Sequence, residues 1–210
     1  MHYSRKDIDN LKHVERINLI NSCSGYKSAN LIGSISKEGI TNVAVFSSVT
    51  HLGSNPPTLG FILRPTTVPR NTYKNIKETG IFTINHIFED ILADAHHTSA
   101  KYPEEISEFD VTNLETEYRP NCIAPFVKGS PVQLKMKFKE EYLIKTNDVL
   151  HIIAEIQDIY VYDTILEEDG FLNLSKGNIA AINGLDAYAV SKSNTRFEYQ
   201  RPKALTEMIQ

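Results

Sequence analysis

The chain has 210 residues, of which 41% are hydrophobic and 23% are charged, and its formal net charge is −4. This composition is ordinary for a globular protein of one domain with a substantial core. Its two cysteines, Cys23 and Cys122, lie far apart and form no Cys-x-x-Cys unit, so we expect two ordinary reduced thiols rather than metal ligands or a redox dithiol. No apolar run approaches the roughly 18 residues of a membrane-spanning helix, and the N-terminus lacks the apolar region of a signal peptide. We therefore expect a cytoplasmic protein without a membrane segment.

Charge is distributed unevenly along the sequence. Residues 1–80 hold ten Lys/Arg and five Asp/Glu (+5), and the remainder holds twelve against twenty-one (−9). A basic first part favours an anionic ligand. A nucleic acid is not expected as partner, because no Lys/Arg run and no interleaving of basic and aromatic residues is present.

The predicted elements begin with residues 1–27, an N-terminal extension with a short helix around 9–21, followed by one domain over residues 28–210. Alternation of apolar and polar residues then predicts six strands, over residues 29–36, 40–47, 58–63, 81–87, 131–143 and 150–162. Helices are expected over 71–79, capped by Asn71 or Thr72 and ended by Gly80, and over 88–102. Residues 104–128 are expected to form a surface excursion, and the tail from 163 to form turns. Six strands with two helical insertions predict a closed or split antiparallel barrel.

Polar side chains that suit a phosphate follow the second and third predicted strands. Ser47, Ser48 and Thr50 follow the second strand, and hydroxyls with free backbone N–H groups at a strand end can bind an anion. The alternative is a serine-rich turn that hydrogen-bonds to itself. Arg64, Thr66 and Thr67 follow the third strand, and Arg70 precedes the predicted helix, whose N-terminus also favours an anion. Taken singly, each arginine is more often a solvated surface charge.

The histidines give weaker signals. Asp90, Asp94 and His97 have the spacing of one helix face, but no metal-binding motif accompanies them, so a solvated acidic face is the favoured interpretation and no metal is predicted. His151 lies in an apolar strand, where a hydrogen-bonded core histidine is more common than a catalytic one. His86 follows a strand end.

The motif Asn42-x-Ala44-x-Phe46-Ser47, followed after eight residues by Pro56-Pro57, resembles the flavin reductase-like family. Residues 69–85 (PRNTYKNIKETGIFTIN) resemble a second family segment, from which Asn71 departs because aspartate is commoner there. Shorter matches occur at 107–109, 124–125, 130–132, 184–188 and 196–202, so the resemblance covers roughly residues 25–202.

The resemblance implies a mainly β fold, a six-stranded antiparallel Greek-key split barrel with short helical insertions that holds FMN non-covalently near the interface of a homodimer. It implies that NADH or NADPH reduces the flavin, which then passes electrons to free flavin or to a partner protein. Hydride transfer to flavin needs no protein acid or base, so no catalytic residue is named. The matching positions expected to bind the cofactor are Asn42, Phe46, Ser47, Ser48, Val49, Thr50, Arg64, Thr66, Thr67, Asn71, Thr72 and Asn85. His86 is placed where it can approach the flavin edge.

Three functions therefore remain open at this point. The first is an NAD(P)H-dependent, FMN-binding oxidoreductase of the flavin reductase-like class. The second is a flavin-binding electron carrier, flavoredoxin-like, without nicotinamide activity. The third is a barrel that has lost its flavin and serves as a structural or small-ligand domain, against which the hydroxyl loop and Arg64 argue.

Overall fold

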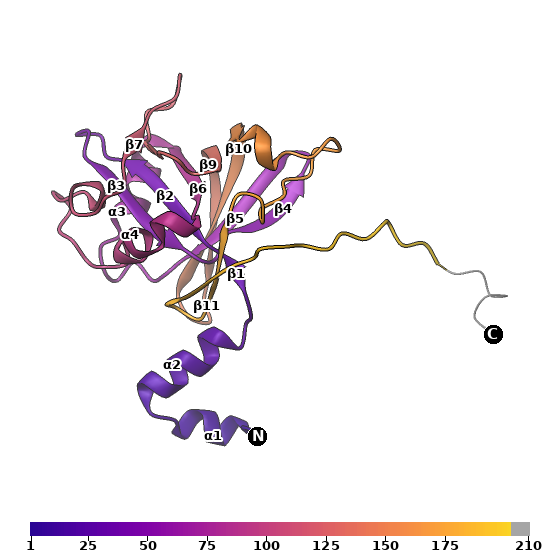
Figure 1. The fold of residues 1–210 in the computed structure, drawn as a ribbon. Coiled ribbons are helices and arrows are strands. Elements are labelled where there is room, and N and C mark those ends of the chain that lie inside the picture. Colours follow the sequence, from indigo (N-terminus) through magenta and orange to yellow (C-terminus); the bar gives the residue numbers. More distant parts are fainter. Residues whose placement is uncertain (203–210) are drawn as a thin grey trace.

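The computed structural model describes residues 1–202, and its body is one seven-stranded antiparallel sheet (Figure 1). The strands lie in the order β3-β2-β6-β9-β10-β5-β4. Their bounds are β2 (Asn30–Ile35), β3 (Thr41–Phe46), β4 (Thr50–Ser54), β5 (Pro57–Leu63), β6 (Ile81–His86), β9 (Val132–Ile144) and β10 (Val149–Val161). All six predicted strands are confirmed. The additional strand, β4, lay in a segment predicted as loop, because its mostly exposed residues show no apolar alternation.

The connection between β3 and β4 forces this sheet to curl. These two strands are the opposite edges of the sheet, yet only residues 47–49 separate them in the chain. Seven flat strands would place the edges about 29 Å apart at about 4.8 Å per step. Three linking residues and their two ends reach only about 14 Å. The sheet therefore closes on itself, and loop 47–49 crosses the seam of the barrel.

The barrel interior is filled by the apolar side chains that the alternation predicted. Phe46, Phe61 and Phe82 form an edge-to-face series, with ring centroids 5.2 and 5.8 Å apart. Phe46 and Phe61 belong to β3 and β5, so this contact also packs across the seam. Met136 and Ile152 are fully buried beside them. Aromatic pairs of this geometry stabilise a core beyond the area that they bury.

Helix α3 (Asn71–Thr79) matches its predicted bounds, and Gly80 ends it with a φ of +72°. The predicted cap is wrong, because Arg70 occupies the N-cap position and no side chain caps the helix. The Thr72 hydroxyl instead accepts a hydrogen bond from Asn42. The helix predicted over 88–102 is shorter than expected, comprising η1 (Glu89–Ile91) and α4 (Leu92–His97), since Thr98 turns back to bond the Ala95 carbonyl.

Residues 104–128 are not the surface excursion that was expected. Phe109, Leu114 and Phe126 are buried. Three short elements order the segment: η2 (Glu108–Asp110) and the paired strands β7 (Thr116–Glu117) and β8 (Phe126–Val127). The Glu108 carboxylate accepts a hydrogen bond from the Val43 amide at 3.1 Å. Burial raises the pKa of Glu108 above its usual value. The segment thus covers the β3 edge and satisfies one of its free amides.

The tail does more than form turns, because part of it builds a small second sheet. Strand β1 (Lys27–Ser28) pairs with β11 (Ala180–Asn183), which pairs with β12 (Ala187–Val190). The short helix η3 (Asp163–Ile165) precedes this sheet. These strands are only two to four residues long, too short to show a period in the sequence.

The N-terminal extension forms two helices rather than one, α1 (Arg5–Asn10) and α2 (His13–Ser22), which project away from the barrel (Figure 1). Neither helix contains a buried residue. Residues 191–202 form no helix or strand, and only the last part of this segment extends away from the body (Figure 1). Within residues 1–202, no helix has the length and apolar character needed to cross a membrane.

Candidate functional site

The loop between β3 and β4 (residues 47–49) is fixed to β5 by the hydroxyl group of Ser48. Ser48 Oγ donates to the Ile62 carbonyl at 3.1 Å and accepts from the Ile62 amide at 3.0 Å. Two backbone groups near the end of β5 are thereby paired across the seam, where no strand supplies a partner. Because Arg64 directly follows β5, this anchor brings the loop and Arg64 to the same end of the barrel.

Several of the predicted polar groups are free at this end. Among residues 1–202, the side chains of Ser47, Thr50, Arg64, Thr66 and Thr67 make no hydrogen bond or ion pair. All but Ser47 are exposed, and the segment that carries Arg64, Thr66 and Thr67 leads directly into α3. The first-turn N–H groups of α3 carry the positive end of the helix dipole. Unpaired hydroxyls, a free guanidinium and a helix N-terminus form a set of donors for an anion.

Arg70, at the N-cap of α3, strengthens this set. Its Nε atom is buried and has no hydrogen-bond partner within residues 1–202. A buried donor without a partner costs free energy comparable to a lost hydrogen bond. An anion at this end of α3 offers an acceptor for such a donor. Asn71, the next residue, is partly buried, and its side chain makes no hydrogen bond within the described chain.

Other predicted site residues are already bonded within the protein. Asn42 Nδ2 donates to Thr72 Oγ1 at 3.0 Å, and both residues are buried, so the pair fastens the start of α3 to β3. Asn85 has an exposed fraction of 0%, donates to Leu31 and Thr83, and accepts from the Val127 amide. A buried, fully bonded Asn85 offers no surface to a cofactor, so we leave it out of the site. Ser48, Asn42 and Thr72 position the site through the contacts just described.

A cavity of about 630 Å³, which the sequence did not indicate, is connected to the same loop through one of its lining residues, Ser28. Its walls come from β1, the start of β2, the end of β6, β11, β12 and the segment around Leu174. The Ser28 hydroxyl, on its rim, donates to the Val49 carbonyl at 2.8 Å, and Asn30 pairs with Phe46. Loop 47–49 is thus bonded both to a residue of the cavity lining, Ser28, and to the end of β5 that carries Arg64. No local sequence pattern predicts the cavity, because its lining comes from three separate parts of the chain, residues 26–30, His86 and residues 174–191.

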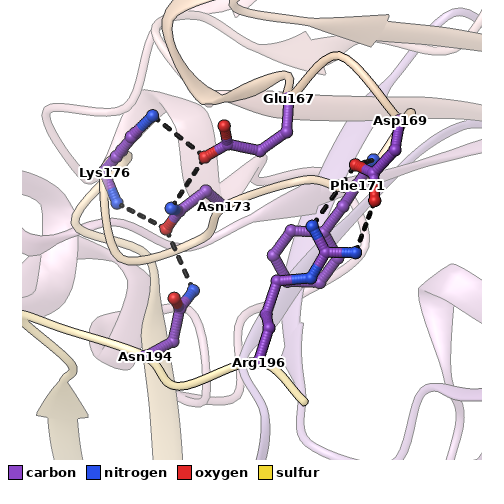
Figure 2. Close-up of polar contacts among 7 residues, drawn as sticks. All are labelled: Glu167, Asp169, Phe171, Asn173, Lys176, Asn194 and Arg196. Carbon is purple, nitrogen blue, oxygen red and sulfur yellow. Dashed lines mark hydrogen bonds and ion pairs between the residues drawn. The ribbon is translucent and has the colours of Figure 1, made fainter. Parts of the chain in front are cut away.

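A cluster of polar contacts holds one wall of this cavity in place (Figure 2). Arg196 donates to the Asp169 carboxylate through its two terminal guanidinium nitrogens, Nη2 at 2.6 Å and Nη1 at 3.3 Å, and its guanidinium lies 4.1 Å from the ring centre of Phe171. Asn194 donates to Asn173, which in turn donates to Glu167. The tail is thereby fastened to loop 166–176, which carries the cavity residues Leu174 and Ser175. Arg196 holds the pKa of Asp169 below its usual value through this hydrogen bond.

The remaining candidates do not assemble into a site. Asp94 accepts hydrogen bonds from Asn113, and His97 pairs with the Tyr102 hydroxyl at 2.6 Å. No three His, Cys, Asp or Glu groups within residues 1–202 are placed to hold a metal ion. His151 packs against Gly60 and makes no hydrogen bond in the described chain, unlike the bonded core histidine that was expected.

His86 lines the cavity, and burial lowers its pKa to about 4. Its ring is therefore neutral near pH 7. Because the unfolded chain binds a proton at a pKa of about 6.5, unfolding takes up a proton between these two values. The lowered pKa of His86 thus leaves the free energy of unfolding unchanged above about pH 6.5 and reduces it increasingly as the pH falls from about 6.5 towards about 4.

We expect wild-type protein to lose more unfolding free energy than His86→Gln when the pH is lowered from 7.5 to 4.5. Urea unfolding at several pH values measures this difference between the two proteins. His13→Gln, a substitution of an exposed histidine in α2, should follow the wild-type curve. Parallel curves for wild type and His86→Gln would contradict the neutral state of the partly buried His86 ring.

Comparison with known proteins shows which family this barrel resembles. The family model "Flavin reductase like domain" matches residues 26–182. A structure from Shewanella frigidimarina, described as a candidate flavin reductase with a split barrel domain, is 44% identical, with a TM-score of 0.92 over 95% of this chain and 100% of that one. An uncharacterized protein of Aquifex aeolicus is 30% identical over 69% of this chain and 74% of its own length. The FMN-binding protein of Thermus thermophilus is 13% identical over 83% of this chain and 92% of that one; its TM-score of 0.71 shows a shared fold alone. The chain has the split-barrel fold and belongs to the flavin reductase-like family.

Proposed function

We propose that this protein binds FMN non-covalently and is a flavin reductase in which NADH or NADPH supplies hydride to the flavin. The observation that carries the proposal is the seam anchored by Ser48. It brings free anion donors together at the end of β5, and a hydrogen bond from Ser28 connects the same loop to a residue that lines an apolar cavity. This combination suits a molecule that has both a phosphate and a flat aromatic ring.

The residues present fit such a cofactor. Arg64, Thr66, Thr67 and the first-turn amides of α3 would hold the phosphate, and the orphaned Nε of Arg70 would gain an acceptor. Ser47, Thr50 and the Val49 backbone would contact the polar edge of the ring. The bound flavin supplies the hydride-accepting chemistry, while the protein positions it and limits access of water. The electron acceptor would be free flavin or a partner protein.

A homodimer with the flavin near the interface is part of this proposal. Helices α1 and α2 bury no residue against their own chain, and short helices of this kind are marginal in water without packing. Phe197 and Tyr199, in the extended tail, are 85% and 89% exposed. A second copy of the chain offers cover for both sets of apolar side chains.

The dimer is tested by light scattering after size exclusion. We expect the mass of two chains for the wild type and a shift towards one chain for Phe197→Ser/Tyr199→Ser. Lys101→Ser, an exposed substitution in a separate loop, is the control. A single-chain mass for wild-type protein at all concentrations would rule out this part of the proposal.

The reductase activity is tested by anaerobic absorbance spectroscopy of the protein reconstituted with FMN. We expect a protein-bound flavin band that bleaches on addition of NADH or NADPH and returns with oxygen. A flavin band that bleaches with light but is unaffected by both nucleotides would instead identify a flavoredoxin-like carrier. If no flavin band appears, the protein does not bind FMN, and the barrel serves as a structural or small-ligand domain.

The phosphate site is tested by comparing FMN with riboflavin, which lacks the phosphate. We expect Arg64→Gln to weaken FMN binding by about tenfold, on the order of one charge-assisted hydrogen bond, and to leave riboflavin binding nearly unchanged. Fluorescence titration measures both affinities. Lys37→Gln, which removes an exposed charge at the other end of the β2–β3 hairpin, should change neither. An equal loss for both flavins would mean that Arg64 does not contact the phosphate.

A further inference from the structure

His86 is the last residue of strand β6, and its side chain lies on the face of the sheet that forms the barrel interior. Two residues earlier on the same face, Ile84 is a buried core residue. His86 pairs with Asn30 of β2, and Asn30 pairs with Phe46 of β3, so these three side chains share one face. Because Phe46 directly precedes loop 47–49, His86 lies in the row of residues that ends at this loop.

The His86 ring is partly buried in the cavity wall, and its two nitrogens are both unpaired and accessible. Neither nitrogen makes a hydrogen bond within residues 1–202, and neither is enclosed, in contrast to the buried Asn30 Nδ2. A neutral imidazole has one N–H donor and one acceptor nitrogen. An apolar residue at this position would continue the core, whereas His86 gives the cavity a polar group.

The other donors of the cavity lining are occupied within the protein or lie in solvent. Lys27 Nζ is held by two backbone carbonyls and one hydroxyl, at 3.0–3.3 Å. The serine hydroxyls of the lining each donate to another group of the protein: Ser28, Ser175 and Ser191. Tyr26 is 69% exposed at the rim. Among the lining residues that the structure describes, His86 therefore offers the accessible donor inside the cavity, and no free charge accompanies it.

We propose that the imidazole N–H of His86 donates a hydrogen bond to the flavin ring and thereby favours the reduced over the oxidised cofactor. This assignment rests on the proposed function, in which the cavity holds the ring. Hydride from the nicotinamide, which is oxidised, brings two electrons and one proton, so the flavin gains one negative charge. A hydrogen bond to a charged acceptor is stronger than one to a neutral acceptor. His86 would stabilise this charge as a neutral donor, without transferring its proton.

The test compares the affinities of the full-length protein for oxidised and for reduced FMN. The ratio of these affinities follows from the midpoint potentials of bound and free FMN, measured by anaerobic reduction against a reference dye. We expect His86→Leu, which removes the donor, to lower the affinity for reduced relative to oxidised FMN by about fivefold or more, the effect of about one hydrogen bond. His86→Gln, which keeps an N–H donor, should restore most of this ratio. Ser175→Ala, a change elsewhere in the lining, should leave the ratio unchanged.

A second measurement, on the wild-type protein, keeps the assignment testable if His86→Leu does not fold. In full-length protein labelled with ¹⁵N-histidine, FMN should shift the ring nitrogen signals of His86, which are identified by their absence from His86→Gln. The signals of the exposed His13 should not move. An unchanged ratio in His86→Leu, an equal loss in Ser175→Ala, or unshifted His86 signals with FMN bound would each overturn this assignment alone. If the wild type binds no FMN, the proposed function fails and this assignment fails with it.

Discussion

The three-residue connection between the two edges of the sheet is the constraint on which the rest of the structure depends. Strands β3 and β4 are neighbours in sequence and are the outermost strands of the sheet. Their short link allows only a closed arrangement, and at the point of closure the regular ladder of backbone hydrogen bonds is interrupted. Ser48 supplies there, with one hydroxyl, the two bonds that a further strand would have made. Backbone and side-chain donors remain unused around that point, and a ligand can bind them.

The strands were predictable because their cause is local. Alternation along residues 131–143 or 150–162 reflects one buried and one exposed face, and that pattern is present in the sequence itself. The bounds of α3 were predictable for the same reason, with Gly80 ending the helix. Strand β4 was not, because an exposed edge strand needs no apolar face. The small sheet and the cavity were not predictable either, since they arise from contacts between the two ends of the chain.

The candidate site was predictable as a region but not in the role of each residue. Ser47 and Ser48 are identical side chains at adjacent positions, yet one is free and the other is bonded to Ile62. Thr72 and Asn42 are likewise polar residues at family positions that bond each other. Composition shows which chemical groups are available, whereas the partner of each group depends on the folded backbone. Asn30 shows the converse, because nothing in its sequence context marks an amide whose donor has no partner.

Because of the contacts around Arg196, the two walls of the cavity depend differently on the salt concentration. The barrel wall is held by buried packing, which salt does not screen, whereas the tail wall depends on ion pairs whose side chains are about half exposed. Such pairs weaken as the ionic strength rises, since the screening length falls to about 3 Å at 1 M salt. One wall of the cavity is therefore insensitive to salt, whereas the attachment of the other wall weakens as the salt concentration rises. The range of molecular shapes that this space accepts would broaden with ionic strength, while the barrel itself stays unchanged.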